Sequence, residues 1–318
     1  MVNQIQVIHE WLLAYPQKRA QRWFEREYDP ASQQEKWYFG NKFKGNRQIL
    51  QKATRRNALF LSTAIQLNND QLKPVFNWFQ QKLTVIGLTS QLIPTLSIAQ
   101  CQTEGGKQKM MAFLNAADLS IVDIQLKTQA LDKKTIQHEP SKPYREQNEW
   151  DKVVPIHFFH TRHDTQEWVP LSLKNNESEG TQKLFALAGH WLDILEKGKI
   201  LLVDELESSL HPLMVRFLMS LLHHPEMNKN NAQLILTTHE TPILDSQLFR
   251  HDQIWFVEKN SENATQLYPL SDFIPRKLTV RSFFYQLIKN RYKILFINFN
   301  ELSFLLRRFD KLIHKDYN

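Results

Sequence analysis

Apolar and polar residues alternate along the first 40 residues, in stretches such as "IQVIHEWLLAYP", "QRWFEREYD" and "KWYFG". A period of two with many aromatic residues predicts antiparallel β-strands. From about residue 46 to 115 the apolar residues recur at helical spacing, as in "ALFLSTAIQL" and "LKPVFNWFQQKL". This part is expected to be helical. A strand is predicted at 119–126, and the polar, proline-bearing segment 127–152 is expected to be an exposed connection or insertion.

The second half of the chain alternates between strand and helix patterns. Two short strands, in "VVPIHFFHTRH" and "EWVPLSL", precede a helix predicted from about 179 to 196. The elements that follow are predicted as strand, helix, strand, helix and strand, at 200–204, 211–223, 233–238, 241–246 and 253–258. Such an alternation is typical of βαβ units and a parallel sheet. The predicted fold class is therefore α/β, with a parallel-sheet core, an antiparallel β region and a helical insertion.

Composition narrows the class of protein. Hydrophobic residues make up 42% of the 318 residues and charged residues 23%, which is typical of a globular chain. No apolar run approaches the ~18 residues of a membrane span. The N-terminus lacks the order of a signal peptide. A single cysteine, Cys101, excludes an internal disulfide framework. We expect a cytoplasmic protein with no membrane partner.

The net charge of +7 and the pI of about 9.3 favour anionic partners such as nucleotides, DNA or an acidic protein. The positive residues are scattered, for example in "RRN", "KNRYK" and "RRFDK". A solvated basic surface and a nucleic-acid footprint therefore both stay open.

Two apolar strands end in residues that carry chemistry. The run "ILLV" leads into Asp204 and Glu205, and "LILTT" leads into His239 about 30 residues later. The carboxyl ends of parallel strands open onto the crevice where α/β proteins bind ligands. Asp204 could hold Mg²⁺, Glu205 could polarise an attacking water, and His239 could contact a γ-phosphate or position that water. The alternative is a pair of solvated acids and a structural histidine.

A third element lies upstream, in "NESEGTQKLFALAGHWL" at 176–192. Ser178, Gly180 and Thr181 stand where the helix is predicted to begin. A helix N-terminus with small residues presents free N–H groups and the positive end of the helix dipole, which suits an anion. An ordinary serine N-cap explains the same residues.

The motifs "SEGTQK", "ILLVDELESSLHP" and "ILTTHE", in this order and spacing, resemble those of ABC-type ATPases in the AAA-like group that includes the OLD nucleases. The RloA-like ATPases linked to abortive infection and restriction loci are similar over about residues 1–280. The resemblance implies an ABC-type, P-loop NTPase-like fold in which two subunits sandwich ATP. It also implies a role in phage defence or restriction.

The resemblance implies a role for each matching residue. Asp204 corresponds to the Walker B magnesium carboxylate, Glu205 to the catalytic base and His239 to the switch histidine. The residues that correspond to the signature motif, which contacts ATP on a second subunit, are Ser178, Gly180 and Thr181. Those that correspond to the D-loop at the dimer interface are Ser209, Leu210 and His211. The implied cofactors are ATP and Mg²⁺.

The phosphate-binding loop, G-x-x-x-x-G-K followed by Ser or Thr, is not found among the eight glycines. In "GNKFKGNR", Asn46 and Arg47 stand where Lys and Ser or Thr are required. In "TEGGKQ", Gln108 follows the lysine. In the resembling family this loop precedes the "EWLLAYP" strand, so we expect a family member that lacks its N-terminal Walker A segment through truncation, a split gene, gene decay or a mis-assigned start.

The resulting domain prediction has three parts: 1–45 as the remnant of the antiparallel β part, 46–130 as a helical insertion or lid, and 131–318 as the C-terminal ATPase core. Without the phosphate loop, the chain alone is expected to bind ATP weakly and to hydrolyse none measurably. A homodimer or a complementing N-terminal fragment would complete the site. OLD nucleases add a domain with an Asp-x-Asp motif, which this sequence lacks, so nuclease activity is expected in a partner. The rival function is a non-catalytic remnant that binds DNA or protein.

Overall fold

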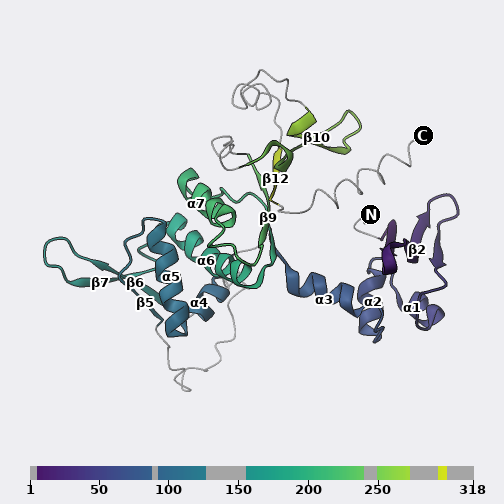
Figure 1. The fold of residues 1–318 in the computed structure, drawn as a ribbon, viewed down its shortest axis with the longest axis horizontal. Helices are drawn as coiled ribbons and strands as arrows, with labels where there is room; N and C mark the ends of the chain where they lie inside the picture. The colour runs from purple at the N-terminus through teal and green to yellow at the C-terminus, as the bar shows by residue number, and fades with distance from the viewer. Residues whose placement is uncertain (1–5, 88–91, 127–154, 240–248, 273–292, 299–318) are drawn as a thin grey trace, which may run out of the picture. The chain divides into compact units, whose positions relative to one another are not determined.

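The chain forms two compact units, Met1–Leu83 and Thr84–Asn318 (Figure 1). The structure is a computed structural model. It describes all residues except 1–5, 88–91, 127–154, 240–248, 273–292 and 299–318. Two predicted features, the exposed connection 127–152 and the helix 241–246, lie wholly outside the described residues. The functional borders expected near residues 45 and 130 stay predictions.

The first unit contains the antiparallel sheet predicted from the period-two pattern. Its strands are β1 (His9–Ala14), β2 (Gln21–Asp29) and β3 (Gln34–Phe39), in the order β1-β2-β3. A 3-10 turn, η1 (Pro16–Lys18), joins the first two strands. Both strand pairs are antiparallel, with Phe24 opposite Leu12 on one side and Phe39 on the other. The prediction for residues 1–40 is confirmed.

Three helices complete the first unit: α1 (Arg47–Ala53), α2 (Phe60–Gln66) and α3 (Lys73–Lys82). Asn46 caps α1, because its side chain accepts a hydrogen bond from the Ile49 N–H. The unit has its own core, in which Phe24 of β2 lies 4.5 Å from Phe60 of α2 between ring centroids. Aromatic residues on one face of the strands thus pack against Phe60 in the first turn of α2.

The second unit is built on a six-stranded sheet with the order β11-β10-β12-β9-β8-β4. The strands, in chain order, are β4 (Leu83–Ile86), β8 (Ile200–Val203), β9 (Gln233–Thr238), β10 (Ile254–Lys259), β11 (Thr265–Pro269) and β12 (Lys293–Asn298). The 3-10 turns η4 (His251–Gln253) and η5 (Leu270–Asp272) flank β10 and β11.

The direction of the strands only partly matches the predicted parallel sheet. β8 and β9 pair in parallel, but β12 pairs antiparallel with both β9 and β10, and β10 pairs antiparallel with β11. The three predicted strands β8, β9 and β10 therefore run in one direction, with β12 inserted between the last two. The sequence pattern did not predict β4, β11 or β12, because strands this short carry no period that separates them from a helix or a loop.

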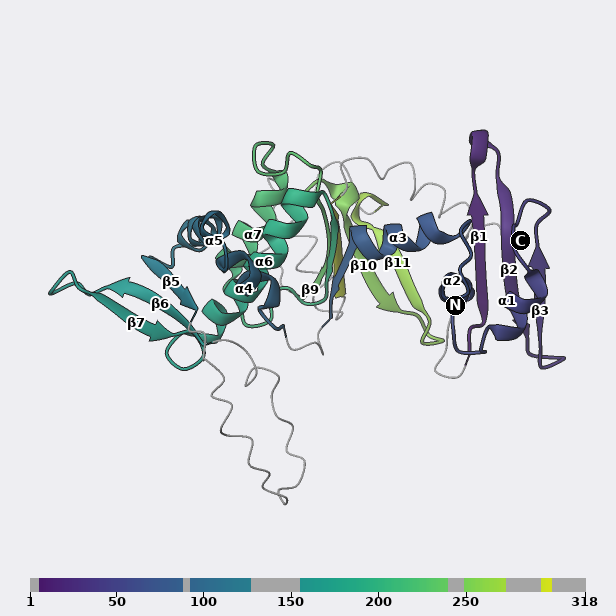
Figure 2. The ribbon, with the colours of Figure 1, turned by 90° about the horizontal axis from the view of Figure 1, so that it is seen from below.

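A second, three-stranded sheet has the order β5-β6-β7. Its strands, β5 (Asp123–Leu126), β6 (Ile156–Thr161) and β7 (Trp168–Ser172), confirm the three strands predicted there. The helices of the unit are α4 (Thr95–Cys101), α5 (Glu104–Ala116), α6 (Glu179–Lys197) and α7 (Pro212–His223). Figure 2 shows α6 and α7 together on one side of β9.

Helix α6 is the centre of the second core. Trp191 is fully buried, and its indole N–H donates to the Leu218 carbonyl of α7 at 2.9 Å. The helix ends at Gly198, whose φ of 57° is left-handed and whose missing side chain leaves room for the Asn230 carbonyl. The start of the helix lies against the loop that follows β8, since Lys183 bonds to carbonyls of that loop. Within the part of the chain that the structure describes, no helix combines the length and apolar character needed to cross a membrane.

Candidate functional site

The parallel pair β8 and β9 brings the two predicted strand ends to the same edge of the sheet. Val203 pairs with Leu236, so Asp204 and Glu205 follow β8 where Thr237 and Thr238 finish β9. Buried residues alternate along both strands, which fixes the register against the core. The carboxylates and His239 therefore leave the sheet side by side, as the carboxyl ends of parallel strands do.

The Thr237 hydroxyl connects the two strand ends. It donates a short hydrogen bond to Asp204 Oδ1, and it accepts the Glu205 backbone N–H at 3.0 Å. The Glu205 side chain in turn contacts His239, since its Oε1 lies 3.3 Å from His239 Nε2. Asp204, Glu205 and His239 thus form one continuous cluster. The structure brings the three residues together, and their roles as a functional site stay predictions.

The cluster faces solvent. The Glu205 side chain is 27% exposed and the His239 side chain 56% exposed. Glu205 has a left-handed φ of 50°, and Ser209 in the same loop has a φ of 61°. A non-glycine residue in this region costs on the order of 1 kcal/mol, and such backbone strain gathers at functional sites. The loop that follows β8 is therefore held in a conformation that the sequence would not adopt by local preference.

The predicted signature residues lie at the start of α6. Ser178 is the N-cap, and its Oγ accepts the Thr181 N–H at 3.1 Å and lies 2.9 Å from the Thr181 hydroxyl. Both hydroxyls thus hydrogen-bond within the helix terminus itself. Gly180 faces the loop after β8, where a Cβ atom would lie 3.1 Å from the Ser209 carbonyl oxygen. The structure brings Gly180 and Ser209 together, from two motifs 29 positions apart.

The predicted D-loop residues Leu210 and His211 have structural contacts. Leu210 is buried in the core of the second unit. His211 caps α7, because its Nδ1 accepts the Leu213 N–H at 3.2 Å, and Pro212 stands at the first helical position. A role for these residues at a subunit interface stays a prediction.

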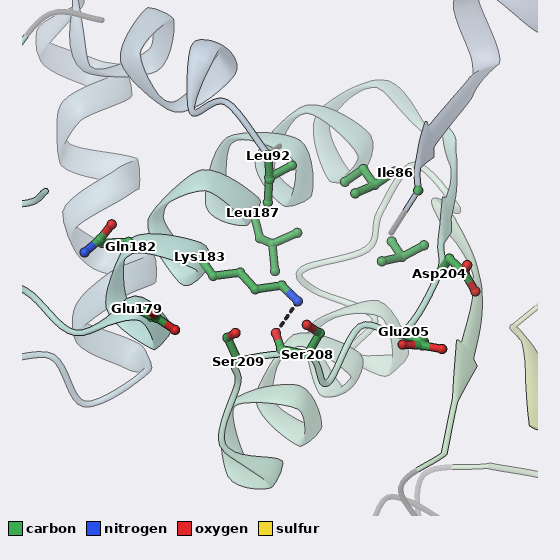
Figure 3. A pocket seen from close by; sticks show the side chains of 12 residues that line it. Ile86, Leu92, Glu179, Gln182, Lys183, Leu187, Asp204, Glu205, Ser208 and Ser209 are labelled. Atoms are coloured by element: carbon green, nitrogen blue, oxygen red, sulfur yellow. Dashed lines mark hydrogen bonds between the residues drawn. The ribbon is translucent and has the colours of Figure 1, made fainter. Parts of the chain in front are cut away.

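A cavity of about 260 Å³ lies between α6, the end of β4 and the loop after β8 (Figure 3). It is lined by Ile86, Gly87, Leu92, Glu179, Gln182, Lys183, Leu187, Val203, Asp204, Glu205, Ser208 and Ser209. Ligand pockets usually measure about 300–1,000 Å³. This cavity is therefore a fitting size for part of a nucleotide rather than for a whole one.

Lys183 is a site residue that sequence reasoning missed. Its ammonium donates to the Leu206 carbonyl at 3.2 Å. It also donates to the Ser208 carbonyl (Figure 3). Burial lowers the pKa of Lys183, and the charges of Glu207 and Glu205 oppose that shift without cancelling it. Lys183 ties α6 to the strained loop. The only signal in the sequence is its place one turn after Gly180, which is equally typical of a solvated lysine.

Thr237 and Glu207 were also missed. Thr237 is a polar residue in an apolar strand, a signal that could have found it. Glu207 accepts the His239 backbone N–H on its Oε1 at 2.7 Å. Its other oxygen, Oε2, is buried with no hydrogen-bond partner among the described residues.

The oxygen atoms of the cluster suit a magnesium ion that keeps other ligands. No group of three or more His, Cys, Asp or Glu residues in the described parts of the chain could hold a metal ion alone. Mg²⁺ is usually bound by one or two carboxylates, with waters and phosphate oxygens at its remaining positions. Asp204, with the Thr237 hydroxyl beside it, offers one such carboxylate.

Comparison with known proteins places the chain in a family. A search of curated proteins finds no match. A family model described as "AAA domain, putative AbiEii toxin, Type IV TA system" matches residues 2–245, which is most of the chain and includes every residue of the cluster. AAA domains bind nucleotides, usually with Mg²⁺. The chain belongs to this AAA domain family.

Proposed function

We propose that this chain carries the hydrolytic half of an ATP site of the ABC type. The observation that carries the proposal is the contact between Glu205 and His239, at 3.3 Å, beside Asp204 at the ends of two parallel strands. An acid pair and an imidazole at the carboxyl edge of a sheet are suited to hydrolysis of a triphosphate. One carboxylate can hold the Mg²⁺ that neutralises charge on the phosphate oxygens, and the other can accept the proton of the attacking water. The family match supports nucleotide binding.

The chain's own residues then have distinct tasks. Glu205 Oε1 or Oε2 would accept the proton of the attacking water, and His239 Nε2 would hold that carboxylate in place. Asp204 would hold Mg²⁺, with its orientation set by the Thr237 hydroxyl. The bound Mg²⁺ would neutralise charge on the β- and γ-phosphates. Lys183 would keep the loop that carries Glu205 against α6.

None of the eight glycines stands in the pattern G-x-x-x-x-G-K-S/T, and the cavity is small for a nucleotide. We infer that a second polypeptide completes the site, either a complementing segment that carries G-x-x-x-x-G-K-S/T or a second copy that supplies the start of its α6. Phosphate-loop amides and lysine provide most contacts to the nucleotide. The chain alone is therefore expected to bind ATP weakly.

The family description names a toxin of a toxin–antitoxin system. We extend this to the present chain as a role in phage defence, with nucleotide hydrolysis driving a separate effector such as a nuclease. The resemblance to RloA-like proteins supports the same context.

The decisive experiment measures Mg-ATP binding by calorimetry and phosphate release, for the chain alone and with an added polypeptide that carries the phosphate loop. We expect weak binding and no measurable turnover for the chain alone, and magnesium-dependent turnover once the phosphate loop is supplied. Glu205→Gln should abolish that turnover and leave binding intact. Glu196→Gln, a change at an exposed residue of α6 that pairs with Lys109 at 3.7 Å, is the matched control.

Two outcomes would contradict the proposal. Tight Mg-ATP binding by the isolated chain would show that the phosphate contacts lie within these residues. Turnover that survives Glu205→Gln would show that the hydrolytic group lies elsewhere.

A second candidate function, a DNA-binding module, is favoured by the net charge of +7. Filter binding of duplex DNA at several salt concentrations, with and without ATP, separates the two candidates. Binding that falls steeply with salt and ignores ATP indicates the DNA-binding module.

A further inference from the structure

Glu207 has contacts that a solvated loop residue would lack. It follows β8 in the loop 204–211, yet its Oε1 accepts the backbone N–H of His239, 32 positions away, at 2.7 Å. Its Oε2 is buried and has no hydrogen-bond partner in the described ranges. Leaving a carboxylate oxygen buried and unpaired is costly. No contact within the loop itself explains why the Glu207 side chain is buried in this way.

Glu205 and Glu207 approach the same histidine from two sides. Glu205 Oε1 contacts the His239 ring at Nε2, whereas Glu207 holds the His239 backbone. Leu206, which is fully buried, anchors the loop between them. The distance from the ring to Glu205 therefore depends on where Glu207 holds the end of β9.

The loop itself is fixed on both sides of Glu207. Lys183 donates to the carbonyls of Leu206 and Ser208, which flank this residue. The positive charge of Lys183 also lies close enough to sense the carboxylate of Glu207. The buried Oε2 thus has a compensating charge nearby, although it has no direct hydrogen bond. The backbone on both sides of Glu207 is thus bonded to α6, while its side chain accepts the His239 N–H.

We propose that Glu207 is a positioning residue, which holds the end of β9 so that the His239 ring stays against the Glu205 carboxylate. The significance of this contact for hydrolysis rests on the function proposed above. The contact itself does not need nucleotide, so it is measured on the chain alone.

The first measurement is hydrogen exchange of the His239 amide, followed by NMR. Glu207→Ala removes the acceptor, so the exchange rate should rise on the order of 10-fold or more, as expected for the loss of a hydrogen bond to a charged group. Glu207→Gln keeps an amide oxygen at the same position and should retain most of the protection. Glu196→Ala, an exposed control, should leave the rate unchanged.

The second measurement reports on the ring. Glu205→Gln should shift the ¹⁵N signals of the His239 ring in the wild-type background, because the contacting carboxylate becomes neutral. In the Glu207→Ala background, Glu205→Gln should shift those signals by at most about half of the wild-type shift. The reason is that the His239 ring no longer stays in contact with the Glu205 side chain. An unchanged His239 exchange rate in Glu207→Ala, or an equal shift in both backgrounds, would overturn the proposal.

The third measurement applies once turnover is reconstituted. Glu207→Ala should lower kcat about 10-fold and leave KM within about 2-fold, because positioning of the base acts on the chemical step. Adding the change to His239→Ala should have no further effect. A raised KM with an unchanged kcat would contradict a positioning role. If wild-type protein shows no turnover at all, the proposed function fails, while the exchange and NMR results still decide the role of Glu207.

Discussion

Each compact unit contains a group of charged side chains, and the two groups differ in how they use their hydrogen bonds. In the first unit the Arg26 side chain is fully buried, and its terminal nitrogens donate to four oxygens: Ala58 O at 2.8 Å, Glu35 Oε1 at 2.7 Å, Arg55 O at 3.2 Å and Arg56 O at 2.9 Å. In the second unit the carboxylates of Asp204 and Glu205 lie at the surface, on a loop with left-handed backbone angles.

The difference separates structure from function. The Arg26 group joins the sheet to the segment before α2, and its guanidinium also lies 5.1 Å from the centre of the Trp37 ring. Both terminal nitrogens of Arg26 donate inside the unit, whereas its Nε is buried with no hydrogen-bond partner among the described residues. The cluster around Glu205 leaves carboxylate oxygens accessible and keeps strain in the backbone. A charged group that is closed on itself stabilises a fold, whereas one that stays open is suited to a ligand.

The largest effect is expected for Arg26→Ala. The change leaves the carboxylates of Glu35 and Glu10 without their buried cation, which should cost about 3–5 kcal/mol in the free energy of unfolding of the first unit. Hydrogen exchange in increasing urea, read from peptides of residues 6–83, measures this. Arg22→Ala is the control, because Arg22 pairs with Glu25 at an exposed position and should cost less than about 1 kcal/mol. Equal losses for the two variants would break the comparison.

The open cluster should respond in the opposite way. Glu205→Gln is expected to reduce phosphate release by the reconstituted site about 100-fold or more, as loss of a general base does. The free energy of unfolding of the second unit should change by less than about 1 kcal/mol, because Glu205 is partly exposed and Lys183, which senses its charge, keeps the charge of Glu207 nearby. A large loss of stability in this variant would make Glu205 a structural residue like Arg26.

The sequence predicted the open cluster better than the closed one. Polar residues that follow two apolar strands are visible in the chain, and parallel pairing then places them together without further information. Arg26 lies in "WFEREY", where a charged residue is expected on the solvent side. Since residues i and i+2 of a strand share a face, Arg26 instead points with Phe24 into the core. Three of its four acceptors come from a segment about 30 positions later, which local pattern cannot reveal.

The same limit explains the missed residues in the site. Lys183 is buried only because the loop after β8 folds against α6, and Glu207 meets His239 only after β8 and β9 pair. β4 was missed because its four residues, "LTVI", directly follow a helix and are too few to show a period of their own. The fold class and the strand ends follow from local patterns, whereas the long-range contacts that orient the site do not.

Two buried carboxylates extend the comparison to pH. Burial raises the pKa of Glu10 above its usual 4.5, against hydrogen bonds from the Phe60 and Leu61 N–H groups and the charge of Arg26. Its contribution to stability is therefore fully present below pH 4.5 and is lost as pH rises through the raised pKa. Burial also acts to raise the pKa of Asp193, but hydrogen bonds from Lys197 and Lys199, both at 2.6 Å, outweigh it, and the pKa lies below 3.8.

The Asp193 contribution to stability is thus present above pH 3.8 and is lost as pH falls through the lowered pKa. Glu10→Gln should reduce the loss of stability of the first unit on raising the pH above 4.5. Asp193→Asn should reduce the loss of stability of the second unit on acidification below 3.8. Hydrogen exchange resolved by unit measures both changes in one experiment. If a variant and wild type lose stability equally with pH, the carboxylate that was replaced does not cause the pH dependence of its unit.

The smallest effect is expected for Gly180→Ala, at the point where α6 meets the loop after β8. Alanine favours a helix by up to about 1 kcal/mol over glycine, while its Cβ would lie 3.1 Å from the Ser209 carbonyl and displace it slightly. Stability should therefore stay within about 1 kcal/mol of wild type, whereas phosphate release should fall about 3-fold, because the displaced loop carries Glu205.

Gly189→Ala, in the same helix, is the matched control. Its Cβ would lie 2.3 Å from the Ser97 backbone nitrogen, so the closely packed α4 has to move, at a cost of about 1–3 kcal/mol in stability. Gly189 is buried in the core, away from the residues that line the cavity. Turnover per folded molecule should therefore stay unchanged in Gly189→Ala. If Gly180→Ala instead lost stability and kept full turnover, the start of α6 would be a structural contact like the Arg26 group. It would then not be part of the functional site.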